Sequence, residues 1–156
     1  MRLFGSAFGS AVYSIAGGAD AALFTINAST GALTFSAAPN FEAPADAGAD
    51  NVYDVTVQVS DGAGGTDTQA IAVTVTNVNE APLITSDGGG ATASVSAAEN
   101  QTVATTVTSS DVDGGAPVYS VVGGADAARF TIDARLGTLS FVSAPDFEAR
   151  SDVDGN

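Results

Sequence analysis

The sequence predicts an all-β fold built from tandem β-sandwich domains, and three observations carry that prediction. Apolar and polar residues alternate in several short segments, and a stretch of 35 residues occurs twice. No segment shows a sustained apolar stripe with the 3.6-residue period of a helix. Apolar residues make up 45 % of the 156 residues, which is enough material for a core.

The alternation defines the predicted strands in order along the chain. The clearest lie at residues 53–59 and 71–75, where valine, isoleucine and tyrosine alternate with polar residues and alanine, and a weaker one covers residues 103–107. Glycine-rich stretches separate the segments and mark turns. Asp20 and Asp126 are expected to cap single helical turns. Shorter strands are predicted at 118–122, 130–132 and 139–141, each with a counterpart 106 residues earlier, at 12–16, 24–26 and 33–35.

The internal repeat sets the expected domain organisation. Residues 12–46 align with residues 118–152 at a constant offset of 106, with 22 of the 35 positions identical. A period near 100 residues is typical of tandem sandwich domains and too long for a solenoid unit. With a boundary after Pro82, residues 1–82 are the last two thirds of one repeat and residues 83–156 the first two thirds of the next. We therefore expect both copies to be incomplete and to expose strand edges.

Composition excludes several kinds of chemistry. The chain has 18 acidic residues, four basic residues and no Lys, His or Cys, with a net charge of −14. Cysteine nucleophiles, Ser-His couples and zinc sites made of His or Cys are therefore impossible, and the acidic surface disfavours nucleic acid. No apolar stretch is long enough for a transmembrane segment. All-oxygen chemistry remains, above all the binding of calcium.

Acidic residues and asparagines recur where the predicted strands end. They are also ordinary residues of solvated turns, so position alone does not make them ligands. Their order along the chain is informative: Asn-Phe-Glu and Asp-Phe-Glu after Ala-Pro pairs, a closing Asn-Val-Asn-Glu-Ala-Pro, then Glu-Asn and Asp-Val-Asp-Gly. An Asp61-Gly62 pair ends the strand predicted at 53–59, and the motifs supply the other candidates: Glu42, Asn77, Asn79, Glu80, Glu99, Asp111, Asp113, Asp146 and Glu148.

This order of motifs resembles the cadherin repeat, and most of all the cadherin-like repeats of large bacterial surface adhesins and type I-secreted proteins. The resemblance implies Ig-like Greek-key β-sandwiches with calcium bound between successive domains. It also implies a secreted or cell-surface location and a role in cell adhesion, including homophilic adhesion. The partners implied are neighbouring repeats of the same chain and other cell-surface molecules.

The resemblance can be carried over residue by residue. It implies an interdomain calcium site made of Glu42, Asn77, Asn79, Glu80, Asp111 and Asp113. It implies half-sites for neighbouring repeats at Asp61, before the first copy, and at Glu99, Asp146 and Glu148, after the second. Asn40 stands where the family motif has Asp, so one carboxylate is replaced by an amide.

The sequence thus predicts a calcium-binding repeat segment of an adhesin, with Ca²⁺ stiffening a stalk of many domains. A metal-free Ig-like spacer and a carbohydrate-binding accessory module are the alternatives. Catalysis is not expected, because the acidic motifs recur with the domain period, as structural ligands at each boundary would. The aromatic residues alternate with small polar ones and are interpreted as core rather than as a binding face: Tyr13, Phe24, Phe35, Tyr119, Phe130 and Phe141.

Overall fold

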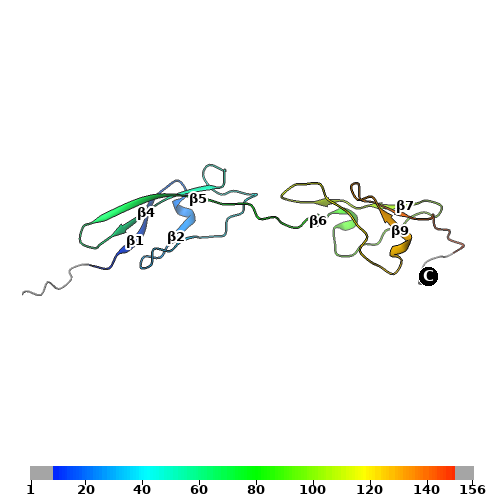
Figure 1. Ribbon diagram of the computed structural model, residues 1–156, viewed down its shortest axis with the longest axis horizontal. Helices are drawn as coiled ribbons and strands as arrows, with labels where there is room; N and C mark the ends of the chain where they lie inside the picture. Colours follow the sequence, from blue (N-terminus) through cyan, green and yellow to red (C-terminus); the bar gives the residue numbers. More distant parts are fainter. Residues whose placement is uncertain (1–8, 150–156) are drawn as a thin grey trace, which may run out of the picture. The chain divides into compact units, whose positions relative to one another are not determined.

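The computed structural model describes residues 9–149 and divides the chain into two compact units, Met1–Val78 and Asn79–Asn156. Each unit is all-β, as predicted (Figure 1). The helices of the described residues are three short 3-10 turns, and none is long and apolar enough to cross a membrane. These turns are η1 (Ala21–Leu23), η2 (Ser86–Gly88) and η3 (Ala127–Arg129).

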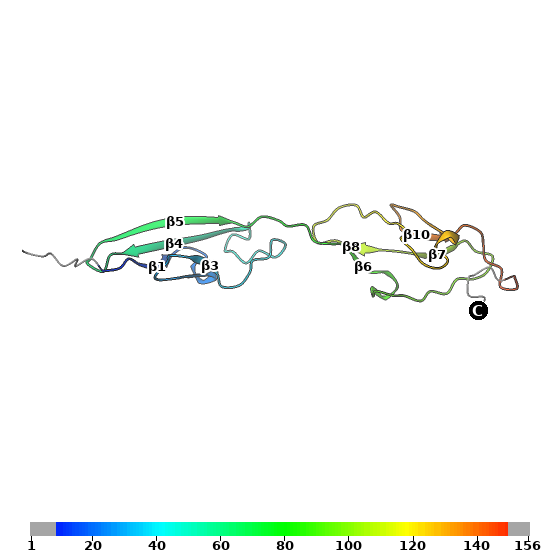
Figure 2. The same ribbon diagram turned by 60° about the horizontal axis from the view of Figure 1, so that its bottom comes forward.

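Unit 1 consists of two antiparallel sheets with a long central strand. The strand β4 pairs with β5 along its whole length and with β1 on its other edge, so the sheet order is β1-β4-β5 (Figures 1 and 2). The strands β2 and β3 form the second, two-stranded sheet. The bounds are β1 (Val12–Gly17), β2 (Phe24–Ile26), β3 (Leu33–Phe35), β4 (Val52–Ser60) and β5 (Thr66–Thr74).

The core of unit 1 is an aromatic cluster between these sheets. Tyr53 and Val55 on β4 are each 1 % exposed, and Phe24 on β2 is 6 % exposed. The Phe24 and Phe35 rings stack with centroids 4.6 Å apart, and the Tyr53 ring meets both edge-on. The interpretation of Phe24 and Phe35 as core residues is confirmed. Alternation along β4 explains the burial, because Tyr53 and Val55 point inward and Asp54 outward.

Unit 2 repeats part of this arrangement. Its three-stranded sheet has the order β7-β10-β9, and β6 pairs with β8. The rings of Phe130 and Phe141 lie 4.7 Å apart, as their counterparts do in unit 1, but both are only half-buried. The buried hydrophobic residues of the described chain all lie in unit 1. The bounds are β6 (Leu83–Ile84), β7 (Val103–Thr106), β8 (Ser109–Ser110), β9 (Phe130–Ile132) and β10 (Thr138–Phe141).

The 106-residue repeat persists at the level of single hydrogen bonds. The Tyr13 N–H donates to the Ala28 carbonyl at 2.9 Å, and the Tyr119 N–H donates to the Ala134 carbonyl at 2.9 Å. Gly31 and Gly137 take the same left-handed conformation, with φ of 75° and 70°. A Cβ at Gly31 would lie 3.1 Å from the ring of Tyr13, so this turn needs glycine for both its conformation and its space.

Two sequence-based expectations are wrong. Residues Val118–Val122 do not form a strand, although the nearly identical segment β1 does. The reason is pairing: β1 is hydrogen-bonded to β4, whereas no strand of the described residues pairs with residues 118–122. The side chains of Asp20 and Asp126 also do not cap η1 and η3, although both turns form where predicted.

The unequal cores predict unequal sensitivity to truncation. We expect Phe24→Ala to destabilise unit 1 by about 3–5 kcal/mol, because it removes a buried ring from a three-ring cluster. The matched variant Phe130→Ala should destabilise unit 2 less, because that ring is only partly buried and packs on one other ring. Hydrogen exchange with peptide resolution under denaturant reports each unit separately. Equal losses in the two units would contradict this account of the core.

Candidate metal centre

Unit 2 brings three acidic side chains from two loops close together. Carboxylate oxygens of Glu99, Asp146 and Glu148 lie within 4.8 Å of one another, and all three residues are exposed. Backbone hydrogen bonds join the two loops that carry them. The Phe147 N–H donates to Oε2 of Glu99 at 3.1 Å, and the Asn100 N–H donates to the Pro145 carbonyl at 2.9 Å. The cluster is therefore held by the loop backbones.

The donor set of this cluster fits calcium. Three carboxylates this close repel one another unless a cation lies among them. Two oxygens bound to one Ca²⁺ at ~2.3–2.6 Å can be at most about 5 Å apart, and the observed spacing satisfies that limit. All the ligand atoms are oxygens, which hard cations prefer. Among the described residues, the ion pair joins Arg129 to Asp126, and neither residue belongs to this cluster.

A second acidic turn in unit 2 follows β8. The Asp113 N–H donates to Oδ1 of Asp111 at 2.9 Å, and the Gly114 N–H donates to the Asp111 carbonyl at 3.2 Å, so the turn closes on itself. The Glu80 N–H donates to Oδ2 of Asp113 at 2.6 Å, and the Asn79 side chain donates to the Glu80 carbonyl. Four of the predicted calcium ligands are thus brought together within unit 2 by direct hydrogen bonds.

In unit 1, Glu42 lies on a turn with the same geometry as the turn of Glu148. The Glu42 N–H donates to Oδ1 of Asn40 at 3.0 Å, and the Glu148 N–H donates to Oδ1 of Asp146 at 3.0 Å. The amide of Asn40 therefore does the structural work of the aspartate but brings no negative charge. Glu42 is exposed, and the side chain of Asn51 fixes this turn by donating to the Phe41 carbonyl at 2.9 Å. Asn77 also belongs to unit 1, after β5.

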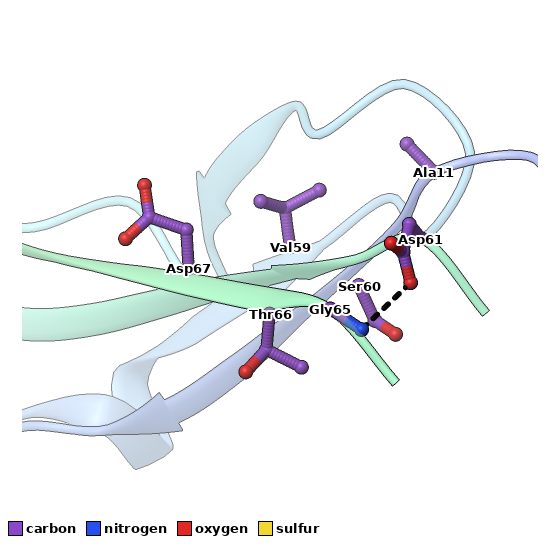
Figure 3. A pocket seen from close by; sticks show the side chains of 7 residues that line it. All are labelled: Ala11, Val59, Ser60, Asp61, Gly65, Thr66 and Asp67. Atoms are coloured by element: carbon purple, nitrogen blue, oxygen red, sulfur yellow. Dashed lines mark hydrogen bonds between the residues drawn. The ribbon is translucent and has the colours of Figure 1, made fainter. Parts of the chain in front are cut away.

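Asp61 occupies a different setting, the hairpin between β4 and β5. Its Oδ1 accepts a hydrogen bond from the Gly65 N–H at 2.9 Å (Figure 3) and another from the Ala63 N–H at 2.8 Å. These two bonds lower the pKa of Asp61. Among the described residues, Asp61 does not belong to a group of three acidic side chains close enough to share an ion. A surface hollow next to it is lined by Ala11, Val59, Ser60, Gly65, Thr66 and Asp67.

Two buried aspartates of unit 1 were not recognised in the sequence as organising residues. Asp20 is 4 % exposed and accepts hydrogen bonds from the N–H groups of Ala47 and Asp54 at 2.7 and 2.8 Å. Asp46 is 6 % exposed and accepts from Asp50 and Asn51. Together they hold the loop that follows Glu42. The partners of Asp20 are 27 and 34 residues away, so no local spacing could reveal this role.

The comparisons with known proteins agree with the fold. Residues 6–74 match the family model of the bacterial Ig domain. Among solved structures, the chain is similar to human protocadherin-24 EC1-2 with 20 % identity and a TM-score of 0.53, over 87 % of this chain and 64 % of that one. It is similar to Drosophila N-cadherin EC1-4 with 19 % identity and a TM-score of 0.57, over 92 % and 35 %. A comparison with curated proteins found no match.

The fold and these comparisons therefore define a protein made of tandem Ig-like β-sandwich repeats. Their architecture is that of cadherin extracellular repeats, and the first repeat carries the sequence signature of a bacterial Ig domain. The predicted cadherin-like fold is confirmed. The chain spans about two thirds of protocadherin-24 EC1-2 and about one third of N-cadherin EC1-4.

The buried Asp46 predicts a particular response to acid. Burial by itself raises the pKa of Asp46. The hydrogen bonds that Asp46 accepts, among them those from the N–H groups of Asp50 and Asn51, together lower the pKa by more than burial raises it, so the pKa lies below the ordinary value of 3.8. A carboxylate whose pKa is lowered by folding stabilises the fold above its unfolded pKa, and this contribution is lost as pH falls through the lowered value.

We therefore expect unit 1 to lose stability on acidification below about pH 4. Asp46→Asn should be less stable than the unaltered protein near neutral pH and should lose less when acidified. Urea unfolding across this pH range measures the difference, with Asp67→Asn, an exposed change on β5, as the control. An Asp46→Asn variant with an unchanged acid slope would show that this carboxylate does not govern the loop.

Proposed function

We propose that this chain is a calcium-binding segment of a secreted or cell-surface adhesin, in which Ca²⁺ bound at the ends of cadherin-like repeats stiffens a multi-domain stalk. The observation that carries the proposal is the group of Glu99, Asp146 and Glu148, three carboxylates held within 4.8 Å by two loops. Such a group costs electrostatic free energy in the absence of a cation and gains it when Ca²⁺ binds.

In this proposal, the junction between the two repeats uses a second set of ligands. Glu42, Glu80, Asp111 and Asp113 supply four carboxylates, and Asn77 and Asn79 contribute amide or backbone oxygens toward the six to eight that calcium takes. The hydrogen bond between Glu80 and Asp113 supports this assignment, because it preorganises half of the set within unit 2. The turn of Asn40 supports it in unit 1, because it presents Glu42 as the turn of Asp146 presents Glu148.

The remaining acidic positions are half-sites for neighbouring repeats. Glu99, Asp146 and Glu148 offer their ligands to a repeat that follows, and Asp61 offers one to a repeat that precedes. Asp61 already accepts two backbone hydrogen bonds through Oδ1, so Oδ2 is the atom it contributes. The partners in this proposal are first of all other repeats of the same kind, and then molecules on neighbouring cell surfaces, including further copies of the adhesin.

Rigidity is the main consequence of binding, and affinity is secondary. Extracellular calcium modules bind with Kd of ~10⁻⁴–10⁻³ M. At a calcium concentration ten times Kd, each site stabilises the folded protein by about 1.4 kcal/mol. This suits a protein that works outside the cell, where calcium is abundant, and the net charge of −14 keeps the unfolded chain self-repelling before it reaches calcium. The role is structural rather than enzymatic.

Calcium titration of the chain tests the proposal. By isothermal calorimetry we expect Kd values of ~10⁻⁴–10⁻³ M, and a melting temperature several degrees lower in chelator than in saturating calcium. The double variant Glu99→Gln, Glu148→Gln should weaken the site in unit 2 at least about tenfold, because it removes two of three carboxylates. Asp67→Asn, which removes an exposed carboxylate from β5, is the control. Absence of binding heat together with an unchanged melting temperature would favour the metal-free spacer.

The junction is tested by a separate variant. Asp111→Asn with Asp113→Asn should abolish calcium binding at the junction and leave the Glu99 group intact, so the fitted stoichiometry should fall without reaching zero. Asn retains the acceptor oxygens that close the turn and accept the Glu80 N–H, so the variant removes charge and keeps the fold. A variant that binds calcium with unaltered stoichiometry would remove Asp111 and Asp113 from the ligand set.

A further inference from the structure

Two three-residue motifs of the chain have the pattern of N-glycosylation acceptors, and the structure separates them. They are Asn27-Ala28-Ser29 and Asn100-Gln101-Thr102, each an asparagine followed at the second position by a hydroxyl residue, with no proline between. Such a motif is short enough to occur by chance, so the sequence alone assigns no role to either. A role follows only where the fold itself does not use the asparagine amide.

Asn27 begins the turn between β2 and β3 and lies at the surface of unit 1. The turn extends beyond the ladder of these two strands, and residues 27–30 are all exposed. The side-chain Oδ1 of Asn27 accepts hydrogen bonds from the N–H groups of Ser29 and Thr30 at 2.9 and 3.0 Å, which fixes the turn. Among the described residues, Nδ2 of the same amide donates no hydrogen bond.

The counterpart of this turn in unit 2 is built without an amide. Asp133 takes the place of Asn27, and its Oδ1 accepts hydrogen bonds from the N–H groups of Arg135 and Leu136, both at 2.8 Å. A main-chain bond also repeats, since the N–H four residues further on donates to the carbonyl of the first residue in both turns, at 2.8 and 2.9 Å. The turn thus requires one side-chain oxygen, and the amide nitrogen of Asn27 has no part in holding it.

The hydroxyl of Ser29 is likewise not needed by the fold. The hydrogen bond of Ser29 in this turn uses its backbone N–H and not its hydroxyl, and the residue is exposed. Its counterpart is Arg135, which has no hydroxyl and whose N–H makes the same bond in the turn of unit 2. Both groups that define the acceptor motif, the amide nitrogen and the hydroxyl, therefore lie at the surface without a structural task.

The second motif has a structural explanation instead. Asn100 has a left-handed backbone conformation with φ of 62°, in which asparagine is enriched over most other residues. Its N–H donates to the Pro145 carbonyl at 2.9 Å, a bond that joins the two loops carrying Glu99 and Asp146. The backbone conformation accounts for an asparagine at this position, so no glycan is assigned to Asn100.

We propose that Asn27 is an N-glycosylation site whose sugar comes from a sugar diphosphate. Nδ2 of Asn27 forms a bond to the anomeric carbon of the sugar, and the bond between that carbon and the phosphate oxygen breaks. The diphosphate leaves with the electron pair, and Nδ2 loses one of its two protons to a base of the transferase. The diphosphate is carried by a nucleotide or by a lipid, and the chemistry at Asn27 is the same for both. The proposal does not rest on calcium binding, because none of the candidate ligands lies in this turn.

The modified side chain remains an amide, so the turn can keep its hydrogen bonds. The oxygen of Asn27 still accepts from Ser29 and Thr30, while the sugar replaces one of the two hydrogens on Nδ2. The sugar extends from exposed residues outside the strand ladder. Glycosylation therefore adds a bulky, hydrated group to the surface without a change in the fold of unit 1.

Peptide mass spectrometry of the protein isolated from the cells that naturally produce it tests the proposal. The peptide that carries residues 27–29 should be heavier by one or more sugar residues, with the added mass located on Asn27. Blocking the synthesis of lipid-linked sugars in those cells should remove the added mass if the donor is lipid-linked and leave it if the donor is a nucleotide sugar. Either result supports the site and identifies the donor. An unmodified peptide in the natural protein would overturn the proposal.

Variants made in the same cells test each group of the motif. Asn27→Asp and Ser29→Ala should abolish the added mass, whereas Ser29→Thr keeps the hydroxyl and should retain it. Asn27→Asp keeps the oxygen that Asp133 uses in unit 2, so its turn should stay folded, which protection of the Gly31 amide from hydrogen exchange checks. Asn100→Asp is the control at the other motif and should leave the sugar in place. A sugar that persists in Ser29→Ala, or one that is lost in Asn100→Asp, would contradict the assignment to Asn27.

Discussion

The antiparallel pairing of β4 with its two neighbours is the interaction on which the rest of unit 1 depends. It aligns nine residues of β4 with nine of β5 and fixes which side chains face inward, so that Tyr53 and Val55 meet the rings of the second sheet. The same strand also holds the loop that follows Glu42. The carboxylate of Asp20 accepts one hydrogen bond from the Asp54 N–H on β4 and another from the Ala47 N–H in that loop. Unit 2 shows the importance of this strand by comparison. Where no such strand is present among the described residues, a segment of nearly the same sequence forms no ladder and its valines face solvent.

Carboxylates serve two purposes in this protein, and their surroundings separate the two. Asp20, Asp46 and Asp133 accept hydrogen bonds from backbone N–H groups and organise loops. For Asp133 the N–H groups of Leu136 and Arg135 lower the pKa, as backbone donors do for Asp61. Glu99 and Asp146 also accept backbone N–H groups, but together with Glu148 they are exposed and crowded within 4.8 Å of one another. Among the described residues no ion pair compensates this crowding, which is unfavourable for structure alone, so the group supports the proposed ion-binding role and Asp20, Asp46 and Asp133 do not.

Much of the fold follows from local signals in the sequence. Period-two alternation located β4, β5 and β7, and the gapless repeat located β2, β3, β9 and β10 by correspondence. The error at residues 118–122 has a clear cause: local sequence gives the preference for extension, but a strand exists only when a partner is present. The Asp-Phe-Glu motif and Glu99 could be recognised by order along the chain, and the structure brings them together. The roles of Asp20 and Asp46 could not, because their partners are set by tertiary contacts rather than by spacing.

The substitution of Asn40 for an aspartate has a consequence for long arrays of such repeats. The turn keeps its shape, so Asn40 presents Glu42 as Asp146 presents Glu148, and under the proposed function the site at Asn40 has one negative charge fewer with which to hold an ion. Joints along one filament would then empty at different calcium levels as the ion is withdrawn. A stalk with both kinds of joint would bend first at its weaker positions and stay straight elsewhere, so its compliance would be graded rather than all-or-none.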